Sequence, residues 1–260
     1  MTVQKELTTE EFWNNYWRNI QLPNTVNPGF TFDRCLSEKL KKRIQETGIK
    51  GSVLEIGAAP GKWLAYLFEI GEFKPSGLDY SSAGVDAMKE NFKMLNITPD
   101  DFYIGDFFQI EPKKKYDVVM SFGFIEHFEN TDNVIEKHLQ WLKPGGVLVL
   151  GVPNFNSIHG LLQYFLKRSI LRVHNLKIMN LKFFKGLEKK FPLRTHSVEY
   201  LGSFEPTLPI ADKKTGMKEF LPKLFIKVFY QLRKWKSTDK INGPWISSYI
   251  LAVYHKKDNA

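Results

Sequence analysis

Cysteine is almost absent from this sequence, and long apolar runs are absent altogether. The single cysteine, Cys35, has no partner for an internal disulfide, which excludes a disulfide-stapled secreted module and favours a reducing, cytoplasmic setting. No window approaches the ~20 consecutive apolar residues that a transmembrane helix needs. The first 13 residues also lack the apolar stretch of a secretory signal, so we expect no such signal.

Acidic residues are scarce in the second half of the chain. Residues 1–154 hold 17 Lys and Arg against 21 Asp and Glu, whereas residues 155–260 hold 20 against 7, a net charge of +13. This asymmetry indicates either that the second half contacts an anionic partner or that it carries a solvated basic face. Hydrophobic residues make up 43% of the 260 residues, which excludes a mainly disordered chain.

Hydrophobic periodicity predicts an α/β fold. Amphipathic helices are expected over 8–20 and 33–46, and apolar runs then alternate with helical stretches from residue 51 onward. Strands separated by single helices indicate βαβ units and a parallel sheet. The expected strands are 52–56, 75–79, 102–104, 116–121, 147–152, 197–201 and 248–255, and the expected helices between them are 62–70, 83–95, 131–142, 161–172 and 180–190. We therefore expect an N-terminal helical segment (1–50) and one main domain (51–260), divided into halves 51–154 and 155–260, with an insertion over 203–246.

A glycine-rich turn follows the first expected strand. In Gly57-Ala58-Ala59-Pro60-Gly61 the glycines allow a ligand to approach the backbone, and the next helix offers unpaired N–H groups. Asp79 ends the second strand, where a carboxylate accepts hydrogen bonds from ribose hydroxyls. Asp106 and Phe107 follow the third strand. The Asp106 carboxylate could accept a hydrogen bond from an exocyclic amine, and the Phe107 ring could stack on a base. The carboxylates of Glu55, Asp79 and Asp106 would repel a pyrophosphate and suit a cationic nucleoside. Alternatively, Asp79 and Asp106 are ordinary N-caps of the helices that follow them.

Taken together, these motifs resemble the class I S-adenosylmethionine-dependent methyltransferases over residues 51–153. The resemblance also includes Tyr116-Asp117-Val118-Val119 and the Leu142-Lys143-Pro144-Gly145-Gly146 turn, while Ala59 stands where the family more often has glycine. It implies a Rossmann-like, seven-stranded, mostly parallel sheet with helices on both faces, S-adenosylmethionine as cofactor and S-adenosylhomocysteine as product. The residues that it implies for the cofactor are Glu55, Gly57, Ala58, Ala59, Gly61, Asp79, Tyr80, Asp106, Phe107, Ser121 and Phe122.

Two branches of this family compete. The Ala58–Gly61 turn followed by Trp63 looks like the ribosomal RNA 2′-O-methyltransferases, but the catalytic Lys-Asp-Lys-Glu set of that group has no counterpart here. Residues 116–128 and 142–154 instead resemble the small-molecule methyltransferases of the ubiquinone-biosynthesis type, which carry a triplet like Ile125-Glu126-His127 after the fourth strand. We therefore expect a small-molecule acceptor and no nucleic-acid partner.

Methyl transfer needs a base only for the proton of the acceptor, and histidine suits that task. His127 and His174 are the candidates; His127 could instead be a structural histidine that bonds the backbone below the cofactor. His159 is a weaker third candidate, with a lone surface histidine as the alternative. No His, Cys and Asp cluster has metal-ligand spacing, so we expect no metal.

Two helical segments outside the cofactor motifs could contact the acceptor or its surroundings. Trp13, Tyr16 and Trp17 resemble an aromatic lid over the cofactor, although they could simply anchor their helix on the edge of the sheet. Residues 217–236 mix aromatic residues with Lys and Arg at helical spacing. This insertion could rest on an anionic membrane, pack on its own domain, or recognise an anionic acceptor.

We therefore expect a cytoplasmic methyltransferase that methylates an oxygen of a sugar, phenol or lipid precursor, with peripheral membrane contact through residues 217–236 as an open alternative. Oxygen is favoured because Ser121-Phe122-Gly123-Phe124 stands where amino-group methyltransferases carry an Asn-Pro-Pro-Tyr-type motif. Two alternatives stay open. One is a methyltransferase or binder of nucleic acid, and the other is a non-catalytic cofactor-binding subunit.

Overall fold

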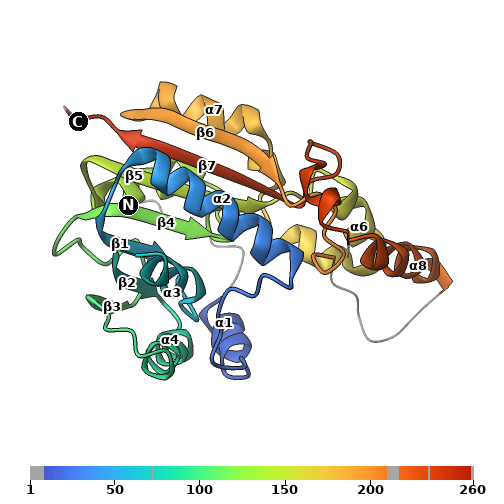
Figure 1. Ribbon diagram of the computed structural model, residues 1–260, viewed down its shortest axis with the longest axis horizontal. Helices are drawn as coiled ribbons and strands as arrows, with labels where there is room; N and C mark the ends of the chain where they lie inside the picture. The colour runs from blue at the N-terminus through green and yellow to red at the C-terminus, as the bar shows by residue number, and fades with distance from the viewer. Residues whose placement is uncertain (1–8, 72, 210–216, 234, 259–260) are drawn as a thin grey trace.

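A computed structural model describes residues 9–71, 73–209, 217–233 and 235–258, with the side chains of 217–222, 236 and 237 outside the description. Parts of two expected features fall outside these ranges: Thr8 of the first helix, and residues 210–216 and 234 of the insertion. The described chain forms a central sheet between two layers of helices (Figure 1).

The sheet contains seven strands in the order β3-β2-β1-β4-β5-β7-β6. Pairing is parallel from β3 to β5, while β7 runs antiparallel to both β5 and β6. The expected seven-stranded, mostly parallel sheet is therefore confirmed. The strands are β1 (Gly51–Ile56), β2 (Phe73–Asp79), β3 (Asp101–Ile104), β4 (Tyr116–Phe122), β5 (Leu142–Pro153), β6 (Leu193–Leu201) and β7 (Tyr249–Lys256).

Helices cover both faces of the sheet because its central strands are apolar on both sides. One face packs against α2 (Thr31–Thr47), α3 (Lys62–Glu69) and α4 (Ser82–Met94). The other face packs against α5 (Thr131–Trp141) and α7 (Leu181–Lys190). Val147 to Leu150 alternate between these two cores and are fully buried.

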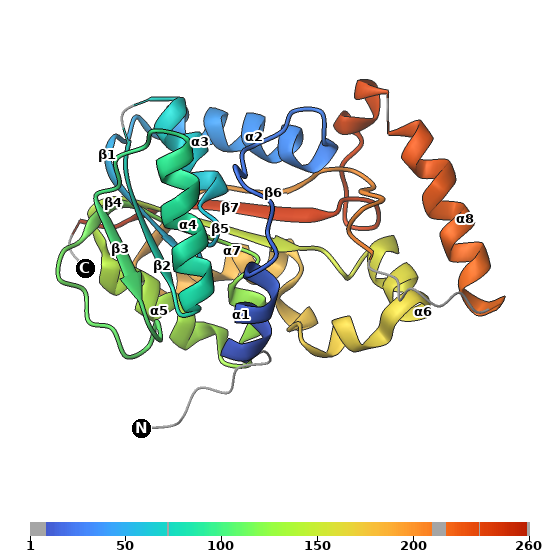
Figure 2. The same ribbon diagram turned by 90° about the horizontal axis from the view of Figure 1, so that it is seen from below.

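The remaining helices lie near the carboxyl ends of the parallel strands. α1 (Glu10–Trp17) lies beside α4, and α6 (Ile158–Arg172) and α8 (Met217–Leu232) extend away from the sheet (Figure 2). Short 3₁₀ turns over Ile125–His127, Leu176–Ile178 and Lys236–Lys240 complete the element list. In α/β proteins this edge of the sheet is where ligands bind.

Several expected boundaries need correction, and β6, for example, begins at Leu193 and not at residue 197. The first helix ends at Trp17 and not at residue 20, since Leu22 and Pro23 already belong to the crossing toward α2. β5 begins at Leu142, five residues before the expected start, because Leu142 pairs with Tyr116 of β4. Within the basic insertion, Arg233 is buried, and its Nη1 lies 2.9 Å from Asp239 Oδ1.

Within the residues that the structure describes, no helix combines the length and the apolarity needed to cross a lipid bilayer.

Candidate functional site

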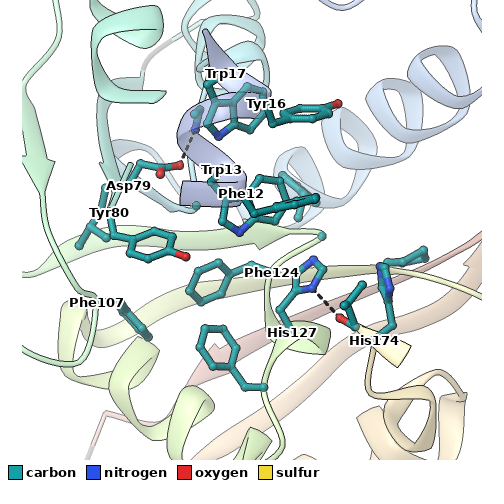
Figure 3. A pocket seen from close by; sticks show the side chains of 18 of the residues that line it. Phe12, Trp13, Tyr16, Trp17, Asp79, Tyr80, Phe107, Phe124, His127 and His174 are labelled. Carbon is teal, nitrogen blue, oxygen red and sulfur yellow. Dashed lines mark hydrogen bonds between the residues drawn. The ribbon is translucent and has the colours of Figure 1, made fainter. Parts of the chain in front are cut away.

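A cavity of about 370 Å³ opens at the carboxyl ends of β1, β2 and β4, within the size range of small-molecule sites. Its walls come from the strand-ending turns, from α1 and from the segment around the end of α6 (Figure 3). The lining residues are Phe12, Trp13, Tyr16, Trp17, Gly57, Ala59, Leu78, Asp79, Tyr80, Gly105, Asp106, Phe107, Phe122, Gly123, Phe124, His127, Phe128, Pro153, Phe155, Ile170, Val173, His174 and Leu208.

The glycine-rich turn after β1 forms one end of the cavity. The N–H groups of Gly57 and Ala58 both donate to the carbonyl of Leu78, at 2.8 and 3.1 Å, which ties the turn to β2. Gly57 has a φ of 70°, and a Cβ there would lie 2.7 Å from Phe124 Cδ2. Only glycine therefore fits at this position, both for its backbone conformation and for the approach of the aromatic ring.

Asp79 lies at the carboxyl end of β2 with its carboxylate on the cavity. It accepts hydrogen bonds from the N–H of Ser81 at 2.9 Å and of Ala59 at 3.2 Å. Burial disfavours its charged form and raises the pKa of Asp79 to about 6. The carboxylate is thus ionised at neutral pH and available as an acceptor.

The turn after β3 supplies the next part of the wall. Asp106 accepts from the N–H of Phe108 at 2.8 Å, while Gly105 and Phe107 also face the cavity. Phe107 packs edge-on against Phe124 at 5.6 Å between ring centroids. Two carboxylates and an aromatic wall thus line neighbouring strand ends.

Four of the predicted cofactor residues lie outside the cavity lining. Ala58 and Gly61 stand on the inner side of the turn, where a Cβ on Gly61 would lie 2.7 Å from Phe92. Glu55 is buried under the turn with Oε2 unpartnered, and burial raises the pKa of Glu55 well above its usual value. Ser121 lies below the cavity floor and its hydroxyl is 3.1 Å from His138 Nε2. These residues support the turn and the floor rather than the wall.

Two imidazoles meet at the opposite end of the cavity. The rings of His127 and His174 lie 4.8 Å apart between centroids. Nδ1 of His127 is 2.9 Å from the carbonyl of Val173, and Nδ1 of His174 is 2.7 Å from the carbonyl of Ile170. Because a carbonyl only accepts, each Nδ1 carries the proton and each Nε2 keeps its lone pair.

Burial keeps both rings neutral. It lowers the pKa of His127 to about 4, with a further contribution from the nearby His174, and it lowers the pKa of His174 as well. Among the described residues, no hydrogen-bond donor reaches either Nε2. His127 therefore combines two features. Its Nδ1 contacts the backbone, as expected of a structural histidine, and its Nε2 is free, as expected of a base.

Glu126 lies next to this pair, and ligand atoms of Glu126, His127 and His174 lie within 4.8 Å of one another. The sequence spacing did not reveal this group because His174 is 47 residues from His127. Glu126 is fully buried with Oε2 unpartnered, and burial raises the pKa of Glu126 to about 8. It is therefore protonated at neutral pH, and it does not line the cavity.

α1 covers the mouth of the cavity with aromatic side chains. Phe12, Trp13, Tyr16 and Trp17 all line it, and Trp13 packs edge-on against His127 at 5.6 Å. The helix is attached through Asn14, whose Oδ1 accepts from Ser81 Oγ at 2.8 Å and from the N–H of Ala83 at 3.2 Å. Its contact is with the start of α4 and not with the edge of the sheet.

Several wall residues have no sequence motif that would identify them. Phe124, Phe128, Phe155, Ile170 and Leu208 come from four separate segments, and only the apolar character of those segments could have suggested them. The third histidine candidate, His159, does not line the cavity, and the alternative of a lone surface histidine is wrong. His159 is buried and not on the surface, its Nε2 accepts from the N–H of Glu205 at 2.9 Å, and its Nδ1 is 2.8 Å from Ser157 Oγ.

The side chains that line the cavity fit a cationic nucleoside. Asp79 and Asp106 accept hydrogen bonds, aromatic rings offer a base-stacking surface, and the described lining contains no Lys or Arg for a phosphate. A dinucleotide would need the reverse arrangement of charge.

Comparison with known proteins agrees with this geometry. Residues 31–190, more than half of the chain, match the profile of a methyltransferase domain family. The mitochondrial ubiquinone biosynthesis O-methyltransferase of Dictyostelium discoideum is 27% identical over 161 residues, which are 56% of this chain and 50% of that protein. A malonyl-[acyl-carrier protein] O-methyltransferase of Ilyobacter polytropus is 24% identical over 117 residues, 45% of this chain and 44% of its own. The chain thus spans about half the length of the curated relatives that it matches.

Solved structures share the fold at low sequence identity. A protein of Galdieria sulphuraria with a proposed sarcosine dimethylglycine methyltransferase activity superposes with a TM-score of 0.62 at 15% identity, over 96% of this chain and 98% of its own. The plantazolicin methyltransferase BpumL, solved in complex with SAH, superposes with a TM-score of 0.55 at 19% identity, over 85% and 82% of the two chains. With the sheet order, the strand-end carboxylates and the match over 31–190, the chain belongs to the class I S-adenosylmethionine-dependent methyltransferase family.

Proposed function

We propose that this protein transfers a methyl group from S-adenosylmethionine to an oxygen of a neutral, largely apolar small molecule. The observation that carries the proposal is the pair of neutral imidazoles, each with a free Nε2, on the same cavity as Asp79 and Asp106. A cofactor site at one end and a proton acceptor at the other end are what oxygen methylation requires.

The cofactor would lie between the turn after β1 and the turn after β3. Asp79 would accept from the ribose hydroxyls, Asp106 from the exocyclic amine, and Phe107 and Tyr80 would border the base. When bound, the cofactor supplies a methyl group on a sulfonium, which is a good leaving group. The carboxylates lying near it would offset its positive charge.

The acceptor would occupy the end of the cavity between the two histidines and Phe155, Ile170 and Val173. With the cofactor bound, the hydroxyl oxygen of the acceptor would take the methyl group as the carbon–sulfur bond breaks, and its proton would pass to Nε2 of His127 or His174. S-Adenosylhomocysteine and a methyl ether would be the products. Tight placement supplies most of the acceleration, since the aromatic wall excludes water and aligns oxygen, carbon and sulfur.

A base role for His127 and His174 is favoured over a metal site. Glu126, the third member of the cluster, is buried and lies outside the cavity lining, so only the two histidines of the cluster face the space for the acceptor. Turnover should therefore survive prolonged dialysis against a chelator. If chelation abolished turnover and a divalent metal restored it, the cluster would be a metal centre and not a pair of bases.

A neutral acceptor is favoured because the described lining has no cationic side chain. Two curated relatives both carry O-methyltransferase in their names, which supports oxygen as the atom methylated. Titration calorimetry with S-adenosylmethionine tests the cofactor site, and a scan of hydroxylated aromatic and isoprenoid compounds for S-adenosylhomocysteine release tests the acceptor. Binding without turnover on any acceptor would favour the non-catalytic alternative, and turnover only on RNA would favour the nucleic-acid alternative.

A further inference from the structure

α6 and α8 form a pair of helices that extends beyond the carboxyl edge of the sheet (Figures 1 and 2). A small core of their own holds them together, with Leu162 and Leu166 of α6 and Phe225 and Phe229 of α8 around Phe204. This core accounts for the inward sides of both helices. Their outward sides carry large apolar residues as well.

On α8, Leu224, Val228 and Leu232 follow one another at four-residue spacing, so they lie on one side of the helix. All three are exposed, and Trp235, three residues beyond Leu232, is 67% exposed. This stripe is separate from the Phe225 and Phe229 side, which is half-buried against α6.

α6 carries a similar exposed stripe. Leu161, Tyr164 and Phe165 fall on one side of the helix, and each is about half exposed. Arg168 lies on the same side, with its guanidinium 4.8 Å from the centre of the Tyr164 ring. Trp245, 79% exposed, lies at the start of α6, because its carbonyl accepts from the N–H of Ile158.

Basic residues flank both stripes. Residues 158–177 contain four Lys and Arg without an acidic residue, and residues 217–240 contain seven against two, of which Arg233 is buried and paired with Asp239. Lysine is depleted from the cores of protein–protein interfaces, whereas helices that lie in a membrane interface combine Lys and Arg with Trp, Phe and Leu. The composition therefore favours anionic lipid over a second protein chain.

The second half of α6, which follows a kink at Lys167, reaches the cavity. Ile170 in the last turn of α6, and Val173 and His174 just after it, line the end of the cavity that would hold the acceptor. A surface that contacts lipid through the first half of α6 would place this end of the cavity close to the bilayer.

We propose that the α6–α8 surface, defined by Leu161, Tyr164, Phe165, Leu224, Val228 and Trp235, docks the protein on an anionic lipid bilayer. Its second part, that the acceptor enters from the bilayer, rests on the proposed function. Docking buries the apolar stripes in the headgroup region, while the flanking cations pair with lipid phosphates.

Vesicle flotation tests docking with the full chain. Wild-type protein should float with vesicles that contain phosphatidylglycerol, remain unbound with pure phosphatidylcholine, and lose binding as salt is raised. Two pairs of substitutions at exposed positions should each weaken the partition coefficient more than about tenfold: Phe165→Ser with Val228→Ser, and Arg168→Glu with Lys227→Glu.

Matched controls on the opposite helices should float like wild type. Phe68→Ser with Met94→Ser removes exposed apolar groups from α3 and α4, and Lys89→Glu with Lys93→Glu reverses two exposed charges on α4. Docking is disproved if wild-type protein stays unbound with anionic vesicles, if control and α6–α8 variants lose binding equally, or if the α6–α8 variants instead abolish a concentration-dependent dimer in solution.

The same variants separate this inference from the proposed function. Phe165, Val228, Arg168 and Lys227 do not line the cavity, so calorimetry with S-adenosylmethionine should give wild-type affinity for all of them. Failed flotation with intact cofactor binding would remove the docking surface and leave the proposed function standing. Failed cofactor binding with intact flotation would remove the proposed function and leave the docking surface standing.

Discussion

The two imidazoles of the cavity differ from ordinary surface histidines in the nitrogen that they leave free. Both Nδ1 atoms are held by carbonyls within one turn of each other, Ile170 and Val173, so the end of α6 orients both rings. Burial keeps them neutral, so both Nε2 lone pairs are unprotonated at neutral pH, but it also makes each ring a weaker base than a solvated histidine.

Replacing the two proposed bases should therefore reduce turnover without affecting cofactor binding. His127→Gln and His174→Gln are each expected to lower kcat by about 10²-fold, the lower range for loss of a general base, while the Kd for S-adenosylmethionine stays within about threefold. Steady-state kinetics and calorimetry measure the two quantities. His159→Gln, which removes a buried histidine outside the cavity, is the control for stability. Full turnover in both His127→Gln and His174→Gln would show that neither histidine is the base.

The raised pKa of Asp79 leads us to expect that cofactor binding depends on pH. Its pKa of about 6 means that the carboxylate gains a proton as the pH falls below 6, and a protonated carboxyl is a poorer acceptor for ribose hydroxyls. Affinity is therefore present above pH 6 and lost below it. Between pH 7.5 and pH 5 the Kd should rise roughly tenfold, since about one carboxyl in ten stays ionised at pH 5.

Asp79→Asn supplies the control for this effect, because an amide has no proton to gain in this range. The variant should bind S-adenosylmethionine more weakly at pH 7.5 and show no such rise toward pH 5. Calorimetry at the two pH values decides. A variant with the same pH dependence as wild type would assign the effect to another group.

Among the elements, α1 is attached to the start of α4 through the side chain of Asn14. It has no buried residue, and the N-terminus of α4 holds it through Asn14. Asn14→Ala removes an acceptor shared by Ser81 and Ala83, so the aromatic cover should open more often. The Kd for S-adenosylmethionine should rise about fivefold, as expected for the loss of about 1 kcal/mol of hydrogen bonding.

Asn15→Ala is the matched control, since Asn15 is exposed on the same helix and its side chain accepts only from Arg18. It should leave cofactor affinity unchanged. If both variants bind alike, α1 does not act as a cover, and its aromatic residues serve only to attach it.

At the scale of the whole molecule, one carboxylate joins the helical insertion to the main domain. Asp239 lies 2.9 Å from both Arg34 of α2 and Arg233 after α8, and both guanidinium side chains are largely buried. Asp239→Ala leaves two cations unpaired, which should lower the free energy of unfolding by about 3 kcal/mol. Denaturant unfolding measures this.

Asp132→Ala removes an ion pair of the same type in an exposed place, between Asp132 and Lys190. Its expected cost is below about 1 kcal/mol, because water screens exposed pairs. Equal losses in the two variants would show that the Arg34–Asp239–Arg233 cluster does not hold the insertion in place.

The sequence by itself determined the sheet and the cofactor end of the site. Apolar runs such as residues 147–152 and the Gly57–Gly61 turn are local patterns, and the carboxyl ends of parallel strands meet at one edge whatever the rest of the chain does. Asp79 and Asp106 could therefore be placed together from their positions alone. Glu55 and Ser121 could not be told from wall residues, because which side of the turn or strand a side chain occupies depends on packing.

The acceptor end was decided only by the tertiary structure. His127 and His174 lie 47 residues apart, and neither the pairing of their rings nor the carbonyls that select their tautomers leaves a periodic signal in the sequence. The basic second half could equally have been a solvated face or a contact surface. Folding places α6 with one end on the cavity and the other beside α8, because their shared core around Phe204 brings together segments distant in sequence, which local patterns do not encode.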